Sequence, residues 1–141
     1  MTEEDKDLLL KDICTRLPYR VRCNYYDCCE GDYDNGTICG FERREYIQID
    51  GVCIHIEEVK PYLLPLSSMT EEQWDNAPRV NLTNFTFESF KCGCFTLSSY
   101  TCENNLHDLL EVINWLYANH FDVNGLIPLG LANDATGLNI Y

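Results

Sequence analysis

The chain has 141 residues, 45% of them hydrophobic, and a formal charge of −13 from 23 acidic and 10 basic side chains. This length predicts a single domain whose core can form without a metal or disulfides, and the hydrophobic content is typical of a globular protein. The negative charge opposes phosphate backbones and anionic lipid surfaces, which argues against direct nucleic-acid or membrane binding. No apolar run approaches the roughly 20 residues of a membrane span, and the acidic start is unlike a signal peptide. We therefore expect a cytoplasmic protein.

The nine cysteines form an odd and unusually large set. A cytoplasmic chain keeps its thiols reduced, so a disulfide framework is the less favoured interpretation. We predict instead that several of these cysteines act as small apolar core residues.

The N-terminal segment 3–16 is predicted to be a helix. Leu9 and Ile13 share one face, Thr2 can cap the first turn, and Pro18 ends the pattern. Residues 19–25 then alternate between apolar and polar side chains, which indicates a half-buried strand.

The most informative stretch surrounds Asp50-Gly51. This dipeptide favours a type I′ turn and separates two β-rich runs, 46–49 and 52–56, so it predicts an antiparallel hairpin. Upstream, we expect a loop over 27–36 with its turn at Asn35-Gly36. Downstream, the strand is expected to continue until Pro61 and Pro65 end its pairing.

The second half of the chain is less regular. Overlapping capping boxes predict a short helix over 70–77, whereas 79–102 fits strands at least as well as a helix. A wide apolar stripe predicts a helix over 104–119, and the tail 122–141 has enough apolar residues to dock on the body. Together these elements predict an α+β domain, in which a small antiparallel sheet, curled toward an SH3-like barrel, packs against an N-terminal and a C-terminal helix.

Several segments carry a family resemblance. The stretch 59–72 (VKPYLLPLSSMTEE), the later 119–132 (NHFD with GLIPLGLA), and the N-terminal 8–19 (LLLKD with RLPY) resemble a set of small uncharacterised proteins encoded by gut anaerobic bacteria and their phages or mobile elements. The cysteine-rich loop 23–39 and the ending 133–141 depart from that pattern. The resemblance implies a phage-associated setting in a bacterial host and transfers no activity or site.

Metal binding is considered because of the cysteines and three histidines. None of the close cysteine spacings is a standard Cys-x₂₋₄-Cys knuckle. The alternative is convergence of four residues on zinc, namely Cys92, Cys94, Cys102 and His107. The acidic loop 27–34 does not start an EF-hand. Counted from Glu30, Gly36 and Glu42 each fall one position later than the glycine and the glutamate of an EF-hand loop. We expect no metal and no cofactor.

Catalytic motifs are not found. No phosphate-binding glycine loop, His-Glu-x-x-His or Gly-x-Ser-x-Gly occurs, and no known signature surrounds a cysteine. His55 is expected to be a hydrogen-bonded sheet residue. His120, at the end of the long helix, is expected to satisfy the last carbonyls and to meet the helix dipole. We predict that the protein is not an enzyme.

Binding remains, and two hypotheses follow. The first is an accessory protein that binds a bacterial host protein, as an acidic nucleic-acid mimic or an inhibitor of a defence factor. The alternative is a binder of a small molecule such as a nucleotide signal, with a virion or structural component as a third possibility. A phosphate ligand needs cations near the hairpins, and the available ones are Arg20, Arg22, Arg43, Arg44 and Lys60. The sequence does not predict an oligomeric state.

Overall fold

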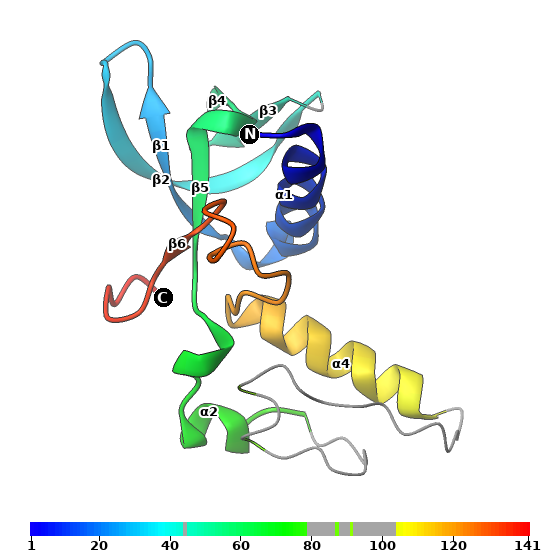
Figure 1. Cartoon of the computed structure of the whole chain (residues 1–141). Helices are drawn as coiled ribbons and strands as arrows, with labels where there is room; N and C mark the ends of the chain where they lie inside the picture. Colours follow the sequence, from blue (N-terminus) through cyan, green and yellow to red (C-terminus); the bar gives the residue numbers. More distant parts are fainter. Residues whose placement is uncertain (44, 79–86, 88–90, 92–103) are drawn as a thin grey trace.

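The structure, a computed structural model, describes residues 1–43, 45–78, 87, 91 and 104–141 (Figure 1). Its α-helices are α1 (Glu3–Arg16), α2 (Glu71–Asp75) and α4 (Asn104–Ala118). Short 3₁₀ helices follow α1 as η1 (Leu17–Tyr19), β4 as η2 (Ile56–Glu58) and β5 as η3 (Leu66–Ser68). The strands are β1 (Arg22–Asp27), β2 (Asp32–Glu42), β3 (Tyr46–Ile49), β4 (Val52–His55), β5 (Val59–Leu63) and β6 (Asn133–Asp134).

The sheet has the strand order β4-β3-β2-β1-β5-β6. The first five strands pair antiparallel and β6 joins β5 in parallel, so the sheet is mixed. The predicted α+β class is confirmed. The sheet does not close into an SH3-like barrel, because β4 and β6 each have a neighbour on one side alone in the described chain.

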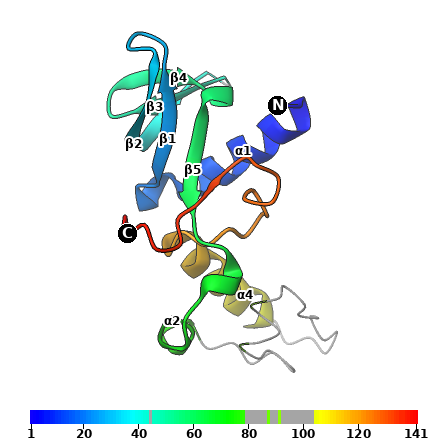
Figure 2. The ribbon, with the colours of Figure 1, turned by 60° about the vertical axis from the view of Figure 1, so that its left-hand side comes forward.

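Helix α1 begins and packs as its sequence predicts. Thr2 forms the capping box with Asp5, each side chain accepting a hydrogen bond from the other's backbone N–H at 3.1 and 2.9 Å. Leu9 and Ile13 are fully buried in a cluster with the sheet residues Ile38, Ile47 and Ile49. The helix therefore covers one face of the sheet, as Figures 1 and 2 show.

The β3–β4 hairpin is confirmed. Asp50 and Gly51 have φ values of 47° and 93°, both positive, as a type I′ turn requires. Tyr46 pairs with His55 and Ile49 with Val52, which buries Ile47, Ile49 and Ile54 on one face.

The β1–β2 connection differs from the expected loop. β2 starts at Asp32, so the turn lies at 28–31 and Asn35-Gly36 lies inside the strand. Gly36 is needed there for close packing, because a Cβ at this position would lie 2.9 Å from Asp50 Oδ2 and would overlap the Ile49 side chain. The hairpin projects beyond the rest of the sheet in both views (Figures 1 and 2).

Strand β5 is also displaced from its prediction. Residues 56–58 form η2, and Pro61 lies within β5 opposite Cys23 of β1. Cys23–Pro61 is the terminal pair of the β1–β5 register, and the end of a ladder is a position where the missing N–H of proline is tolerated. Pro65 does follow the end of the strand and precedes η3.

A second, smaller hydrophobic cluster lies below the sheet in Figure 1. It contains Met69, Val112, Leu116 and Phe121, with Trp74 of α2 packed against them. The predicted short helix is present as α2, capped by a Thr70–Gln73 capping box. The predicted 104–119 helix is present as α4 and ends at Ala118.

The end of α4 is a left-handed cap at His120, whose φ is 61°. The N–H groups of His120 and Phe121 donate to the carbonyls of Tyr117 and Leu116 at 3.1 and 3.0 Å, the pairing of a Schellman motif. Backbone N–H groups therefore satisfy these carbonyls, and the histidine ring does not do so through Nδ1, which is buried without a hydrogen-bond partner. The predicted dipole contact is wrong, because burial and then the Arg16 charge lower the pKa of the ring to about 4 and leave it neutral at pH 7.

The two clusters meet at a polar junction formed by Asp12, Arg16, Phe121 and Asn124. Arg16 and Asp12 are fully buried and joined by two hydrogen bonds of 2.5 and 3.1 Å. Arg16 Nη2 also donates to the Phe121 carbonyl at 2.6 Å, and the Asn124 amide donates to Asp12 at 2.9 Å. This junction ties α1 to the segment that follows α4.

The tail docks on the body as predicted, with Leu126, Leu131, Ala132 and Ala135 buried. Of the six described cysteines, one is a core residue as predicted. Cys23 is buried, whereas five others are exposed, namely Cys14, Cys28, Cys29, Cys39 and Cys53.

The expectation for 79–102 lies outside the described residues, apart from Phe87 and Lys91. Among the described helices, none combines the length and apolar character that crossing a bilayer requires.

Candidate functional site

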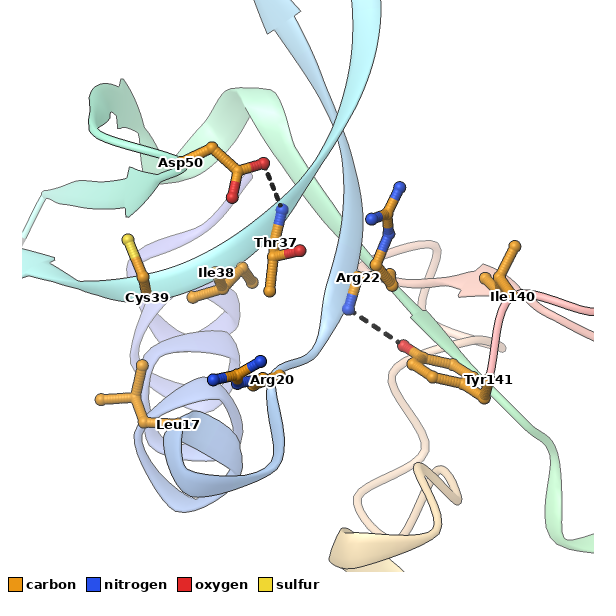
Figure 3. Close-up of a pocket in the computed structure, with 9 residues that line it drawn as sticks. All are labelled: Leu17, Arg20, Arg22, Thr37, Ile38, Cys39, Asp50, Ile140 and Tyr141. Atoms are coloured by element: carbon orange, nitrogen blue, oxygen red, sulfur yellow. Dashed lines mark hydrogen bonds between the residues drawn. The ribbon is translucent and has the colours of Figure 1, made fainter.

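The predicted cations are distributed over separate hollows. Arg20 and Arg22 line one pocket (Figure 3). Arg43 lines a second with Tyr46, and Lys60 lines a third. Arg44 lies outside the described residues. Two of the five residues that the sequence nominated therefore line one pocket, although Figure 3 shows the Arg22 side chain pointing away from Arg20.

The Arg20–Arg22 pocket lies where distant segments converge. Its lining comes from the end of η1, the start of β1, the middle of β2, the β3–β4 turn and the end of the tail. The volume is about 580 Å³, which lies within the range of small-molecule sites. The residues are Leu17, Arg20, Arg22, Thr37, Ile38, Cys39, Asp50, Ile140 and Tyr141.

One wall of this pocket is fixed by backbone hydrogen bonds. Asp50 Oδ2 accepts from the Thr37 N–H at 3.0 Å, as drawn in Figure 3. The Asp50 N–H in turn donates to the Thr37 carbonyl at 3.2 Å. These two hydrogen bonds fix the β3–β4 turn against β2. One oxygen of the Asp50 carboxylate therefore already has a hydrogen-bond partner within the fold.

The opposite wall is the Tyr141 ring. Its hydroxyl donates to the Tyr62 carbonyl at 2.7 Å and accepts from the Arg22 N–H at 3.2 Å. The ring also stacks on His120, with centroids 3.6 Å apart and planes 13° from parallel. Burial raises the pKa of the phenol to about 12, so it stays a neutral donor.

A second candidate surface is the end of the β1–β2 hairpin, called here the hairpin tip and comprising residues 25–34. Strand register places Asp27 opposite Asp32 and Tyr25 opposite Asp34 on one face. Tyr26 and Tyr33 lie on the other face, with their rings 5.3 Å apart in an edge-to-face contact. The tip thus carries its aspartates, together with Tyr25, on one face and the rings of Tyr26 and Tyr33 on the other.

Charge and exposure are concentrated in this region. The twenty residues 23–42 contain five acidic and no basic side chains. Tyr33 is 67% exposed, the largest value among the exposed hydrophobic side chains of the described chain. Such an exposed ring offers contact area at little entropic cost.

The turn of the hairpin brings Asp27, Cys28 and Cys29 together. One ligand atom from each lies within 4.8 Å of the others, the closest approach to a metal-ligand set among the described residues. The Cys28 sulfur, and then the Asp27 carboxylate, raise the pKa of the Cys29 thiol because like charges repel. Three donors, of which Cys28 and Cys29 are exposed, are fewer than the four of a closed structural zinc site.

The zinc alternative from the sequence lies mostly outside the described part of the chain. Cys92, Cys94 and Cys102 belong to the undescribed segments. His107 is exposed, with Nδ1 3.6 Å from a Glu111 carboxylate one turn along α4.

The cysteine and histidine nearest each other in sequence have separate partners. Cys53 donates to Glu42 at 2.9 Å, which raises the pKa of the thiol and disfavours a thiolate nucleophile. His55 accepts from the Glu57 N–H at 3.4 Å and meets the Tyr46 ring edge-on.

Sequence reasoning missed Asp50 and Tyr141 as pocket residues, and Tyr33 as an exposed ring. The first two reach the pocket through contacts over more than ten residues of sequence, which no local pattern encodes. A signal did exist for Tyr33, because it lies between Asp32 and Asp34 in a segment without basic residues.

No protein-family model, curated protein or solved structure matches the chain.

Proposed function

We propose that this chain is a non-enzymatic accessory protein that binds a basic surface on a bacterial host protein, with the hairpin tip as its contact. The observation that carries the proposal is the division of the tip into an acidic face, with Asp27, Asp32 and Asp34, and an aromatic face that includes exposed Tyr33. The bacterial and phage-associated setting rests on the family resemblance of the sequence.

The electrostatics of the tip support a cationic partner. Asp27 and Asp32 are directly opposite each other in the strand register, and like charges in such positions destabilise a hairpin. A basic surface would relieve this repulsion on contact. It would also be steered toward the tip by the net charge of −13.

Basic protein surfaces of this kind commonly serve nucleic acids, whose phosphates they neutralise. Carboxylates presented on a projecting hairpin can occupy the same groove. We therefore favour, as the concrete version, inhibition of a nucleic-acid-handling host or defence factor. The Tyr33 ring would supply the apolar anchor that charge alone does not.

The test is a pull-down from a lysate of a gut anaerobic bacterium, repeated at raised salt and in the presence of duplex DNA. The tip variant combines Asp27→Asn, Glu30→Gln, Asp32→Asn and Asp34→Asn. Asparagine retains an acceptor for the backbone bonds that Asp27, Asp32 and Asp34 receive. The matched control removes four exposed charges elsewhere, by Glu4→Gln, Glu45→Gln, Glu71→Gln and Glu72→Gln.

A specific partner should be retained at low salt and released by DNA. The tip variant and Tyr33→Ala should each lose it, while the control variant should keep it. Retention of nothing at low salt counts against the proposal, as does equal loss in the tip and control variants, because diffuse charge would then explain the binding.

A further inference from the structure

Two adjacent thiols lie at the turn of the β1–β2 hairpin, which projects beyond the rest of the sheet (Figures 1 and 2). They belong to Cys28 and Cys29, and both side chains are exposed. Together with Asp27 they offer three metal-ligating atoms, all within 4.8 Å of one another. No other group of this kind is found among the described residues. Ligand atoms suited to a metal ion are therefore gathered at this turn.

The backbone holds these three residues in one tight turn. The Gly31 N–H donates to the Asp27 carbonyl at 2.7 Å, and the φ of Gly31 is 74°, a left-handed value that glycine adopts without strain. The Cys29 N–H donates to Asp27 Oδ1 at 2.8 Å. A carboxylate has about four acceptor positions, so this bond leaves Asp27 able to contact a cation. The fold thus brings the ligand atoms together before any ion binds.

The charges around the turn favour a cation. The pKa of the Cys29 thiol is raised, mainly by the adjacent Cys28 sulfur, because two neighbouring thiolates repel each other. Asp27 is also directly opposite Asp32 in the strand register, and residues 23–42 include five acidic side chains and no basic one. A cation shared by both sulfurs and Asp27 would stabilise the thiolates and reduce the repulsion between the aspartates.

The ligand types narrow the choice of ion. Thiolates select soft metal ions, of which Cu(I) and Zn(II) are common examples. A closed zinc site takes four ligands, and no fourth His, Cys, Asp or Glu joins the group within the described chain. A metal–sulfur bond of about 2.3 Å places two sulfurs on one ion at most about 4.6 Å apart, a separation that exposed side chains at this turn reach by rotation. Two thiolates and one carboxylate therefore suit Cu(I), which commonly binds fewer ligands, better than Zn(II).

We propose that Asp27, Cys28 and Cys29 bind one Cu(I) ion, with the two sulfurs as its main ligands and the Asp27 carboxylate as a weaker third. Each thiol releases its proton on binding, so two thiolates and Cu(I) together carry one net negative charge, and the tip stays acidic when loaded. The assignment departs from the expectation of no metal, which rested on cysteine spacing and on the EF-hand pattern and not on the folded turn. It goes beyond the proposed host-protein contact and does not depend on it.

The test is an anaerobic titration of the full chain with Cu(I), in a non-thiol reductant and in competition with the coloured chelator bicinchoninate. We expect a tightly bound equivalent of Cu(I) that Cys28→Ser combined with Cys29→Ser removes. Loss of both sulfur ligands should weaken binding at the turn by more than about a hundredfold, since even outer-shell partners of a metal account for about 10–100-fold. Asp27→Asn should give a smaller loss, because asparagine keeps an acceptor for the Cys29 N–H and removes the weaker ligand.

The matched control is Cys14→Ser combined with Cys39→Ser, which also removes two exposed thiols but from separate elements, α1 and β2. It should keep the tightly bound equivalent. Alkylation of the wild type with iodoacetamide, followed by mass spectrometry, is a second measurement that needs no variant. Bound Cu(I) should protect Cys28 and Cys29, while Cys14 and Cys39 should react as they do in the metal-free chain.

Three results would overturn the assignment. The first is that no Cu(I) is retained against bicinchoninate, and the second is an equal loss in the two double serine variants, which would show that any exposed thiol suffices. The third is tight Zn(II) binding that is lost in the same turn variant, which would overturn the choice of ion. The host-protein contact is tested separately, because the serine variants keep every tip carboxylate and Tyr33.

Discussion

Carboxylates occupy two contrasting settings in this molecule, the polar junction and the hairpin tip. At the junction, Asp12 is fully buried and accepts hydrogen bonds from Arg16 and Asn124. At the tip, Asp27 and Asp32 are directly opposite each other, with no cation between residues 23 and 42. The acidic residues of this chain therefore occupy two different environments, because Asp12 is neutralised by Arg16 inside the fold, whereas the tip carboxylates have no cation in their own segment.

The difference has a physical origin in solvation. A buried ion pair loses its water and depends on its partner, so removing one member leaves a charge stranded. An exposed carboxylate keeps its water and interacts weakly through a screened field. Removal of one carboxylate should consequently have opposite effects on stability in the two settings.

The largest effect is expected for Asp12→Ala. Arg16 would remain buried without its counter-ion, which costs about 3–5 kcal/mol of unfolding free energy. Urea denaturation followed by circular dichroism measures the loss. Glu4→Ala on the same helix is the exposed control and should change stability by less than about 0.5 kcal/mol. A loss at Asp12 as small as that of the control would show that the junction does not hold α1 in place.

The next effect concerns His120, whose ring stacks on Tyr141. Its pKa is about 4 in the folded chain against an ordinary 6.5, mainly because the ring is buried. Between these values the unfolded chain binds a proton that the folded chain does not, so stability falls as the pH decreases from 6.5 to 4. The full shift of the pKa corresponds to about 3 kcal/mol of unfolding free energy. Because solvent near the ring screens the effect, the expected loss is about 2 kcal/mol.

His120→Asn isolates this contribution. Asparagine tolerates the left-handed cap and cannot be protonated, while the 23 acidic residues titrate equally in both proteins. The difference in unfolding free energy between the wild type and the variant should shrink as the pH falls through that window. A difference that is constant from pH 7 to 4 would contradict the assignment.

Elements held by contacts between residues close in sequence were predicted better than elements held by contacts between distant residues. Helix α1 was predicted with its bounds, and the β3–β4 hairpin with its turn, because a cap at Thr2 and a turn at Asp50-Gly51 act within a few residues. The second hairpin strand is shorter than predicted, since it ends at His55. The β1–β2 turn was misplaced, since Asn35-Gly36 is a good local turn signal. Its glycine serves a long-range contact with Ile49 instead.

The candidate sites show the same limit. Arg20 and Arg22 were nominated as cations near the hairpins, and the pocket includes both. Tyr141 was not nominated, because it reaches Arg22 from 119 residues away. Asp12 and Arg16 have ordinary helical i,i+4 spacing, and their burial depends on the packing of α4 and the tail. No single-sequence pattern separates such a pair from a surface ion pair.

A smaller effect is expected from Tyr141→Phe, which removes a hydroxyl near the junction. The Tyr62 carbonyl and the Arg22 N–H would each lose a partner, and a lost hydrogen bond of this kind costs about 1 kcal/mol. Tyr33→Phe is the control, since its ring is largely exposed. The melting temperature should be lowered by Tyr141→Phe and unchanged by Tyr33→Phe. Equal melting temperatures would mean that the Tyr141 hydroxyl adds no net stability.

The smallest effect, and the one of opposite sign, is expected from Asp32→Asn at the hairpin tip. Relief of repulsion from Asp27 should raise stability by less than about 1 kcal/mol. The asparagine can still accept the Tyr33 N–H bond. The gain should fade as salt rises, because salt screens exposed charges, while the loss in Asp12→Ala should persist. If Asp32→Asn destabilises the chain at low salt, the tip acids contribute to folding. The proposal that they are free to bind a partner would then have to be abandoned.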